Sequence, residues 1–232
     1  MGNTNIINIH QPKFFTIHNI VTIALLSALS FVLYQFARLP AFPFFPSFLQ
    51  VNLSVIPILL ATFMLGLYGG LTTVVVRGLL SLPFGGETMY IGPLSDFILG
   101  VAVVLPVWLI YSRRKTRINA LIAMGVAVIV GTFVAIISNR YIIIPMYAEL
   151  LYGGMQPIVD WLKPLYADIT VDNFYNIYLW VAVLPFNLMW LIPVTLITFF
   201  LYKPLENLLK SVQNRHKQLD DKQQLYSQLD DV

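Results

Sequence analysis

Apolar residues in this chain come in long blocks, separated by short polar stretches or by stretches rich in proline and glycine. A hydrocarbon core of about 30 Å takes about 20 residues of helix to cross. The blocks predict helices over residues 17–37, 49–67, 71–82, 94–111, 118–144 and 177–202, the third being short because it ends before Pro83. The pattern therefore predicts an all-α integral membrane protein with six transmembrane helices.

The breaks between the blocks contain residues that end helices. Gly66, Gly69 and Gly70 permit a tight turn after the second block. The long segment 145–177 holds prolines and most of the loop acids, and we expect short amphipathic helices around PIVDWLKPLY. Three parts are expected: a cytoplasmic N-terminal segment (1–16), a six-helix membrane domain (17–210), and a polar cytoplasmic tail (211–232).

Composition supports a membrane protein. Hydrophobic residues make up 58% of the chain and charged residues 11%, whereas an average soluble domain has about 25% charged residues. The chain has no cysteine, which excludes disulfides and thiolate chemistry. The first block lacks a clear small-residue cleavage site, so we interpret it as a retained helix and not as a signal peptide.

The charges indicate an orientation. Basic residues gather in the loop 112–117 and near the two ends of the chain, and the acids gather in the opposite loops. The positive-inside rule then places both termini in the cytoplasm. No basic stripe with exposed aromatic residues occurs, so we expect lipid around the protein and no nucleic acid as a partner.

Several kinds of chemistry are missing from the sequence. It contains no GxxxxGK[ST] phosphate loop, no HExxH and no GxSxG. The three histidines, His10, His18 and His216, fall at predicted cytoplasmic ends of helices. We therefore expect no enzyme activity, no cofactor and no metal site, and no internal repeat of the kind that secondary transporters show is visible.

Arg77 lies inside an apolar run, where an arginine at mid-bilayer costs about 3 kcal/mol on insertion scales. Thr73 and Ser81, four residues to either side, share its helix face. Other polar residues fall in the outer half of the predicted helices, which suggests one outward-opening pocket for a small solute. These are Asn52, Ser54, Gly92, Ser95, Asp96, Asn139, Arg140 and Asn187.

Structural roles for these residues stay open. Arg77 can pair with Asp96 and hold helices together, Asn139 and Asn187 can hydrogen-bond between helices, and Arg140 can extend to the interface. In the first helix, Ala24, Ser27 and Ala28 form a small-residue face. That face serves either packing within the chain or docking to another membrane subunit, and a non-transporting scaffold or assembly protein would need the face without a pocket.

Several segments, in this order and spacing, resemble the S components of energy-coupling factor (ECF) vitamin transporters, with the riboflavin-type branch as the most similar. They are SALSFVLYQF, FPSFLQVNLSVIPILLATFMLGLYGGL, IGPLSDFILGVAVVLP, SNRYIIIPMYAELL and LPFNLMWLIPVTLITFFLYKPLENLL. The resemblance covers roughly residues 17–210. It implies a six-helix domain that captures a vitamin from outside and docks through the first helix onto a transmembrane coupling subunit (T component), which two cytoplasmic ATPases drive.

The chain departs from the riboflavin-type pattern at positions that bear on the ligand. Asn52 and Val55 stand where acids are typical, Trp190 and Arg77 stand where lysines are typical, and Ser95–Asp96–Phe97 replaces ANF. Because an arginine fork suits a carboxylate, the sequence favours pantothenate, with riboflavin or a pyridoxine-type vitamin as alternatives. The predicted substrate-binding residues are Arg77, Asn139, Asn187, Asp96, Ser95, Asn52, Trp190 and Thr73.

Overall fold

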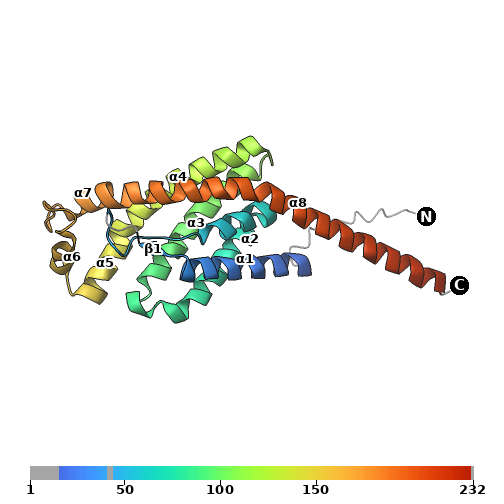
Figure 1. Ribbon diagram of the computed structural model, residues 1–232, viewed down its shortest axis with the longest axis horizontal. Coiled ribbons are helices and arrows are strands. Elements are labelled where there is room, and N and C mark those ends of the chain that lie inside the picture. The colour runs from blue at the N-terminus through green and yellow to red at the C-terminus, as the bar shows by residue number, and fades with distance from the viewer. Residues whose placement is uncertain (1–15, 41–43, 231–232) are drawn as a thin grey trace, which may run out of the picture.

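The computed structural model describes residues 16–40 and 44–230, so the predicted N-terminal segment lies outside the described residues except for Thr16. Long helices run along the length of the molecule (Figure 1). Within the described part, five helical segments are long and apolar enough to cross a membrane: Ile17–Phe36, Val55–Phe84, Ile91–Tyr111, Arg117–Tyr152 and Phe174–Leu208. The count differs from the predicted six at one place, helix α2.

Helix α2 (Val55–Ser81) combines the predicted second and third helices. The two parts meet at Gly66, whose φ of 75° and ψ of −161° interrupt the helix. A Cβ built on Gly70 would lie 2.2 Å from Oγ1 of Thr62, so the arm after Gly66 folds back against the arm before it. The two arms restore the predicted six segments, and the predicted tight turn falls on Gly66. Gly69 and Gly70 are instead helical residues at the contact between the arms.

The other long helices surround this hairpin. Helix α1 (Ile17–Phe36) packs on α2, α2 packs on α3 (Ile91–Tyr111), and α3 packs on α4 (Arg117–Ser138). Helix α8 (Leu184–Asp230) contacts both α4 and α2. The bundle is thereby closed around a common core of apolar side chains.

Shorter elements gather at the end of the bundle away from the two chain ends (Figure 1). Strands β1 (Leu39–Pro40) and β2 (Gln50–Val51) form an antiparallel pair, and the 3-10 turns η1 (Leu82–Phe84) and η2 (Gly86–Thr88) precede α3. The predicted fifth helix continues beyond residue 144 through η3 (Asn139–Ile143), α5 (Ile144–Met146) and η4 (Tyr147–Tyr152). An amphipathic helix is confirmed within 145–177 as α6 (Met155–Leu162), which buries Ile158, Val159 and Leu162.

The predicted sixth helix also has different bounds. It begins with α7 (Phe174–Ile177) and η5 (Tyr178–Val183) and continues through α8 as far as Asp230. Its first residues pack inside the bundle, since Phe174 and Tyr178 are buried, and this burial explains why the helix starts earlier than hydropathy indicated. The predicted boundary between domain and tail at residue 210 therefore lies inside one helix.

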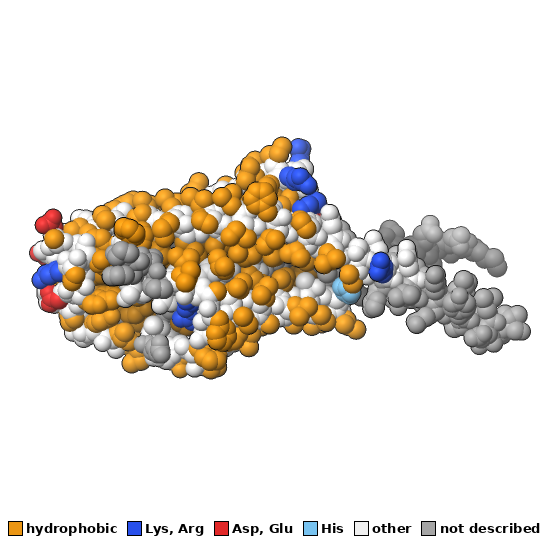
Figure 2. Space-filling view, viewed as in Figure 1, with side chains coloured by type: hydrophobic (Ala, Val, Ile, Leu, Met, Phe, Trp, Pro, Cys, Tyr) orange, Lys and Arg blue, Asp and Glu red, His pale blue; other side chains and the backbone are white. Residues whose placement is uncertain are grey.

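The surface reverses the pattern of a soluble protein. Large apolar side chains such as Leu25, Ile129, Phe133 and Phe200 are 62–72% exposed, and Figure 2 shows apolar side chains along the flank of the bundle. Arginine and lysine side chains gather toward the end from which α8 extends, and acidic side chains lie at the opposite end (Figures 1 and 2). A belt of this kind between two polar ends is the surface that a bilayer requires.

Candidate substrate-binding site

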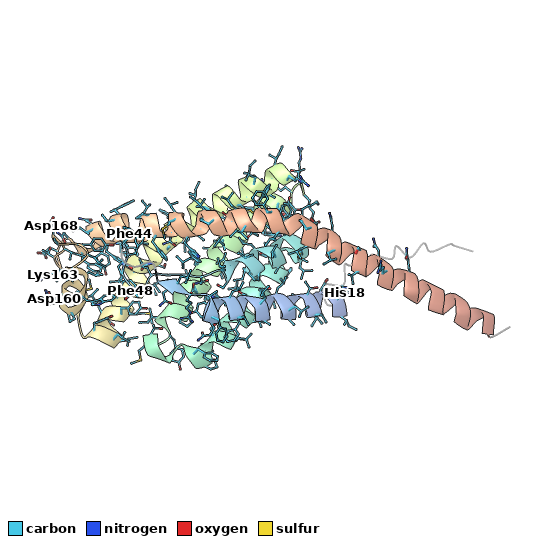
Figure 3. All side chains as sticks on the ribbon, in the orientation of Figure 1. His18, Phe44, Phe48, Asp160, Lys163 and Asp168 are labelled. Atoms are coloured by element: carbon cyan, nitrogen blue, oxygen red, sulfur yellow. The ribbon has the colours of Figure 1, made fainter. Side chains whose placement is uncertain are left out.

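A cavity of about 180 Å³ lies inside the bundle, between the end of α1, the loop before α2, the start of α3, the α4–η3 junction and α8. Asp160 and Asp168 mark one end of the molecule, which we call the acidic end (Figure 3). Phe48, one of the residues that line the cavity, lies toward this end. Six predicted substrate-binding residues line this cavity: Asn52, Ser95, Asp96, Asn139, Asn187 and Trp190. Residues that are far apart in the chain therefore meet at one place, as the sequence suggested.

One wall of the cavity is polar. The amide nitrogen Nδ2 of Asn52 lies 3.5 Å from Oδ1 of Asp96, and Tyr34 lies beside this carboxylate. The Asn52 side chain is fixed from behind, because its Oδ1 accepts hydrogen bonds from the backbone N–H (3.1 Å) and the hydroxyl (2.6 Å) of Ser54. Ser30 of α1 donates in turn to the Ser54 carbonyl at 2.7 Å. This chain of bonds connects α1, the loop before α2, and α3.

Another part of the cavity lining is aromatic. The Trp190 and Phe186 rings stack with centroids 6.3 Å apart and planes 23° apart. The Trp190 indole N–H donates to the Asn52 carbonyl at 2.6 Å, so the ring is held to the loop before α2. Phe48 from that loop lies 5.6 Å from the Tyr147 ring. Flat rings in this part and polar groups in the other give the cavity lining two chemically different parts.

Two asparagines also line the cavity. Asn139 donates through Nδ2 to the Ala135 carbonyl at 2.9 Å and accepts from the Tyr178 hydroxyl at 2.9 Å. Asn187 donates through Nδ2 to the Val183 carbonyl at 2.8 Å. Each side chain uses one amide N–H to bind its own helix, which fixes the direction of its remaining polar groups.

Two predicted site residues do not line the cavity. The Thr73 hydroxyl donates to the Gly69 carbonyl of its own helix at 2.8 Å, and its side chain is fully buried. Arg77 is 2% exposed and lies behind the cavity wall, where Nη2 donates to the backbone carbonyl of Asp96 at 2.9 Å. The predicted carboxylate clamp at Arg77 therefore has no access to the cavity. The helical stripe identified the face that these residues share, but this face packs against α1 and α3 and not against the cavity.

Pairing of Arg77 with Asp96, the structural alternative, takes a different form from a side-chain ion pair. The guanidinium binds the backbone of Asp96 and lies 5.0 Å from the centroid of the Tyr34 ring. Among the side chains that the structure describes, ion pairs closer than 4.0 Å are formed by Lys163 with Asp160 and by Lys203 with Glu206, and neither involves Arg77. Arg140 lies over the Tyr175 ring at 4.9 Å, so it contacts an aromatic ring at the acidic end.

Sequence reasoning missed several residues that line the cavity: Tyr34, Arg38, Phe48, Tyr147 and Phe186. Tyr34 and Arg38 lie four residues apart at the end of α1, and the Arg38 guanidinium stacks 4.0 Å from the Tyr34 ring while Nε donates to the Tyr34 carbonyl. Their spacing was visible in the sequence. The aromatic residues before α2 suggested only an interface, because hydropathy does not distinguish a loop that rests on lipid from one that folds into a cavity.

The small-residue face of α1 is split in the structure. Ala24 and Ala28 are exposed, next to the exposed Leu25 and Leu29. Ser27 is 1% exposed and points into the bundle, so it does not belong to the exposed surface of α1. It is one of the buried residues of this helix, with Ile23, Ser30 and Tyr34, and adjacent residues such as Ser27 and Ala28 point about 100° apart around a helix axis.

The fold and the site together define a multi-pass membrane protein with an internal binding site for a small solute. The family model of the ECF transporter, substrate-specific component, matches residues 18–203, and the chain belongs to this family. Members of this family bind substrate for a transporter and are not enzymes, which agrees with the absence of catalytic motifs from the sequence.

Characterised relatives extend the comparison. The riboflavin transporter RibU of Staphylococcus aureus (strain TCH60) is 29% identical over 213 residues, covering 91% of this chain and all of that protein. RibU of Lactococcus lactis subsp. cremoris (strain MG1363) is 30% identical over 175 residues, covering 72% of this chain and 82% of that protein. The riboflavin transporter FmnP of Bacillus subtilis (strain 168) is 21% identical over 202 residues, covering 86% of this chain and 98% of that protein.

A solved structure supports the same fold. The protein described in "Structure and mechanism of the S component of a bacterial ECF transporter" superposes with a TM-score of 0.64 at 29% identity, covering 83% of this chain and 97% of that one. The relatives bear on the ligand as well, because those described above carry riboflavin in their names and none carries pantothenate. They favour the riboflavin alternative over the pantothenate hypothesis, which rested on the inaccessible Arg77.

Proposed function

We propose that this chain is the subunit that captures riboflavin for an ECF transporter in a bacterial plasma membrane. The named relatives support riboflavin as the vitamin, and the basic loop 112–117 supports a cytoplasmic location for both termini. In this orientation the cavity opens toward the outside, at the acidic end.

The observation that carries the proposal is the pairing of an aromatic wall with amide side chains around one cavity. The isoalloxazine ring of riboflavin is flat and apolar on its faces, and aromatic rings stack with such surfaces. Trp190 and Phe186 supply a stacked pair on one side of the cavity, and Asn139 and Asn187 lie beside them. Amide groups match the alternating donors and acceptors on the edge of a flavin ring.

Trp190 replaces the lysine typical of riboflavin-type members. Its ring lines the cavity, and its N–H is bound to the Asn52 carbonyl. At the position of the lysine, this side chain therefore offers a flat ring for stacking and no charge. A flavin can bind such a wall without the lysine.

The partners follow from the family. The exposed face around Ala24 and Ala28 is proposed to dock onto the T component, and two cytoplasmic ATPases bound to that subunit supply the energy. ATP hydrolysis is therefore assigned to the partners and not to this chain.

Ligand identification tests the proposal directly. We would purify the protein in detergent from bacteria grown in rich medium, denature it, and identify released small molecules by mass spectrometry. Riboflavin should be released, and the emptied protein should quench riboflavin fluorescence saturably, with pantothenate and pyridoxine as matched controls. Well-folded protein that binds no flavin would contradict the proposal and favour a membrane scaffold.

A further inference from the structure

Asp96 belongs to the polar wall of the cavity, in the second turn of α3. Its backbone and its side chain have different partners. The backbone carbonyl accepts a hydrogen bond from Arg77 behind the wall (2.9 Å), whereas the carboxylate is on the side of the cavity, beside Tyr34 and Asn52. The guanidinium therefore holds the backbone of this residue in place without taking up its carboxylate.

The carboxylate keeps hydrogen-bonding capacity. Two carboxylate oxygens together accept about four hydrogen bonds. In the part of the chain that the structure describes, the Asn52 amide nitrogen lies 3.5 Å from Oδ1 of Asp96, at the long limit for a hydrogen bond. Tyr34 lies beside the same carboxylate. Strong acceptor positions thus remain beside the space that a ligand enters.

Two cations lie near the carboxylate. The guanidinium carbons of Arg38 and Arg77 lie 4.0 Å and 5.0 Å from the centroid of the Tyr34 ring, and Tyr34 lies beside Asp96. One residue thus separates both cations from the carboxylate. An ionised carboxylate forms hydrogen bonds about twice as strong as those of a neutral acceptor.

From this geometry we infer that Asp96 is a specificity-determining residue, which accepts hydrogen bonds from hydroxyl groups on the ligand. The inference rests on the proposed function: in riboflavin the hydroxyl groups are those of the ribityl chain. The flat ring then lies on the side of Trp190 and Phe186, and the chain extends toward Tyr34 and Asp96.

Two flavins separate ring recognition from chain recognition. Lumiflavin has the ring of riboflavin with a methyl group in place of the ribityl chain, so it offers no hydroxyl to Asp96. We would measure quenching of the fluorescence of each flavin by the emptied protein, for the wild type and for Asp96→Asn. The matched control is Asp160→Asn, which removes an exposed acid on α6 that pairs with Lys163 away from the cavity.

Wild-type protein should bind riboflavin more tightly than lumiflavin. In Asp96→Asn the riboflavin affinity should fall about 10- to 100-fold, the range for loss of charge-assisted hydrogen bonds, and the lumiflavin affinity should change little. Asp160→Asn should alter neither affinity. The ratio of the two affinities is the decisive quantity, because a substitution that merely distorts the cavity weakens both ligands together.

Two results would overturn the assignment while leaving riboflavin capture intact. One is an equal loss of affinity for both flavins in Asp96→Asn. The other is wild-type protein that binds lumiflavin as tightly as riboflavin, a measurement that does not depend on whether the variant folds. Wild-type protein that binds neither flavin would remove the proposed function itself, and the role of Asp96 with it.

Discussion

Replacement of Gly66 by alanine tests the hairpin that places the second arm of α2 next to the site. Gly66 has φ 75° and ψ −161°, a backbone conformation that is essentially restricted to glycine. A Cβ at this position would meet no heavy atom within 4 Å. Any loss of stability in Gly66→Ala therefore comes from the backbone and not from a side-chain clash.

The magnitude follows from the strain of an L-residue in such a conformation, about 1–3 kcal/mol. We would measure unfolding of the purified protein in mixed detergent micelles by titration with SDS, following tryptophan fluorescence. The free energy of unfolding of Gly66→Ala should fall by that amount. The matched control is Gly125→Ala in α4, where a Cβ also meets nothing within 4 Å but the backbone is helical. This control should be neutral or stabilised, by up to about 1 kcal/mol from helix propensity.

The comparison has a clear refuting result. If Gly66→Ala were as stable as the wild type, or gained stability as the control does, residues 61–70 would have to form a continuous helix. The contact between Thr62 and Gly70 would then be lost, because residues eight apart in a straight helix are about 12 Å apart along the axis. Arg77 could no longer reach α3 from the second arm.

Three further predictions concern single contacts. Trp190→Phe keeps an aromatic ring in the cavity lining but removes the 2.6 Å hydrogen bond to the Asn52 carbonyl. The free energy of unfolding in SDS should fall by about 0.5–1.5 kcal/mol. An unchanged free energy would indicate that this hydrogen bond contributes little to stability. Ala28→Trp on the exposed face of α1 should abolish co-purification of the T component while flavin quenching persists; Ile129→Trp on exposed α4 is the control, and retained co-purification would exclude this docking face. Arg77→Met removes a charged hydrogen bond to Asp96 and should lower the free energy of unfolding by about 1.5–3 kcal/mol, whereas a stabilised variant would show that desolvation of the charge outweighs its contacts.

Hydropathy was sufficient to predict the membrane segments because each spans many residues, and even the turn between the second and third segments was marked by glycine. It was sufficient also to bring Asn52, Asp96 and Asn187 to one level of the bundle, since topology determines the level at which each residue lies. It was insufficient for the direction of Arg77 and Ser27. The face of a helix that meets a cavity depends on how neighbouring helices are rotated, and rotation is set by packing between residues far apart in sequence.

Hydropathy was also insufficient to identify the aromatic residues that line the cavity. Phe48 occurs in the predicted loop before the second helix and Tyr147 in the predicted segment 145–177, and nothing local distinguishes rings that line a cavity from rings at the lipid interface. Tyr34 and Arg38 gave a signal in their four-residue spacing. Their importance becomes visible only when α3 brings Asp96 to the same place.

The packing around Arg77 offsets part of the cost of placing an arginine inside the membrane, a cost that the sequence already indicates. Its guanidinium is buried between α1 and α3, and within the described residues its Nε has no hydrogen-bond partner, which costs about 1–3 kcal/mol. The Asp96 carbonyl and the Tyr34 ring compensate in part, and both depend on close approach of the second arm of α2 to α3. Gly100 permits that approach, since a Cβ there would lie 3.1 Å from the Val74 side chain and 3.7 Å from Nη2 of Arg77. A glycine on one helix thus allows an arginine on another to hold the backbone of Asp96, and the carboxylate of that residue remains available to the cavity.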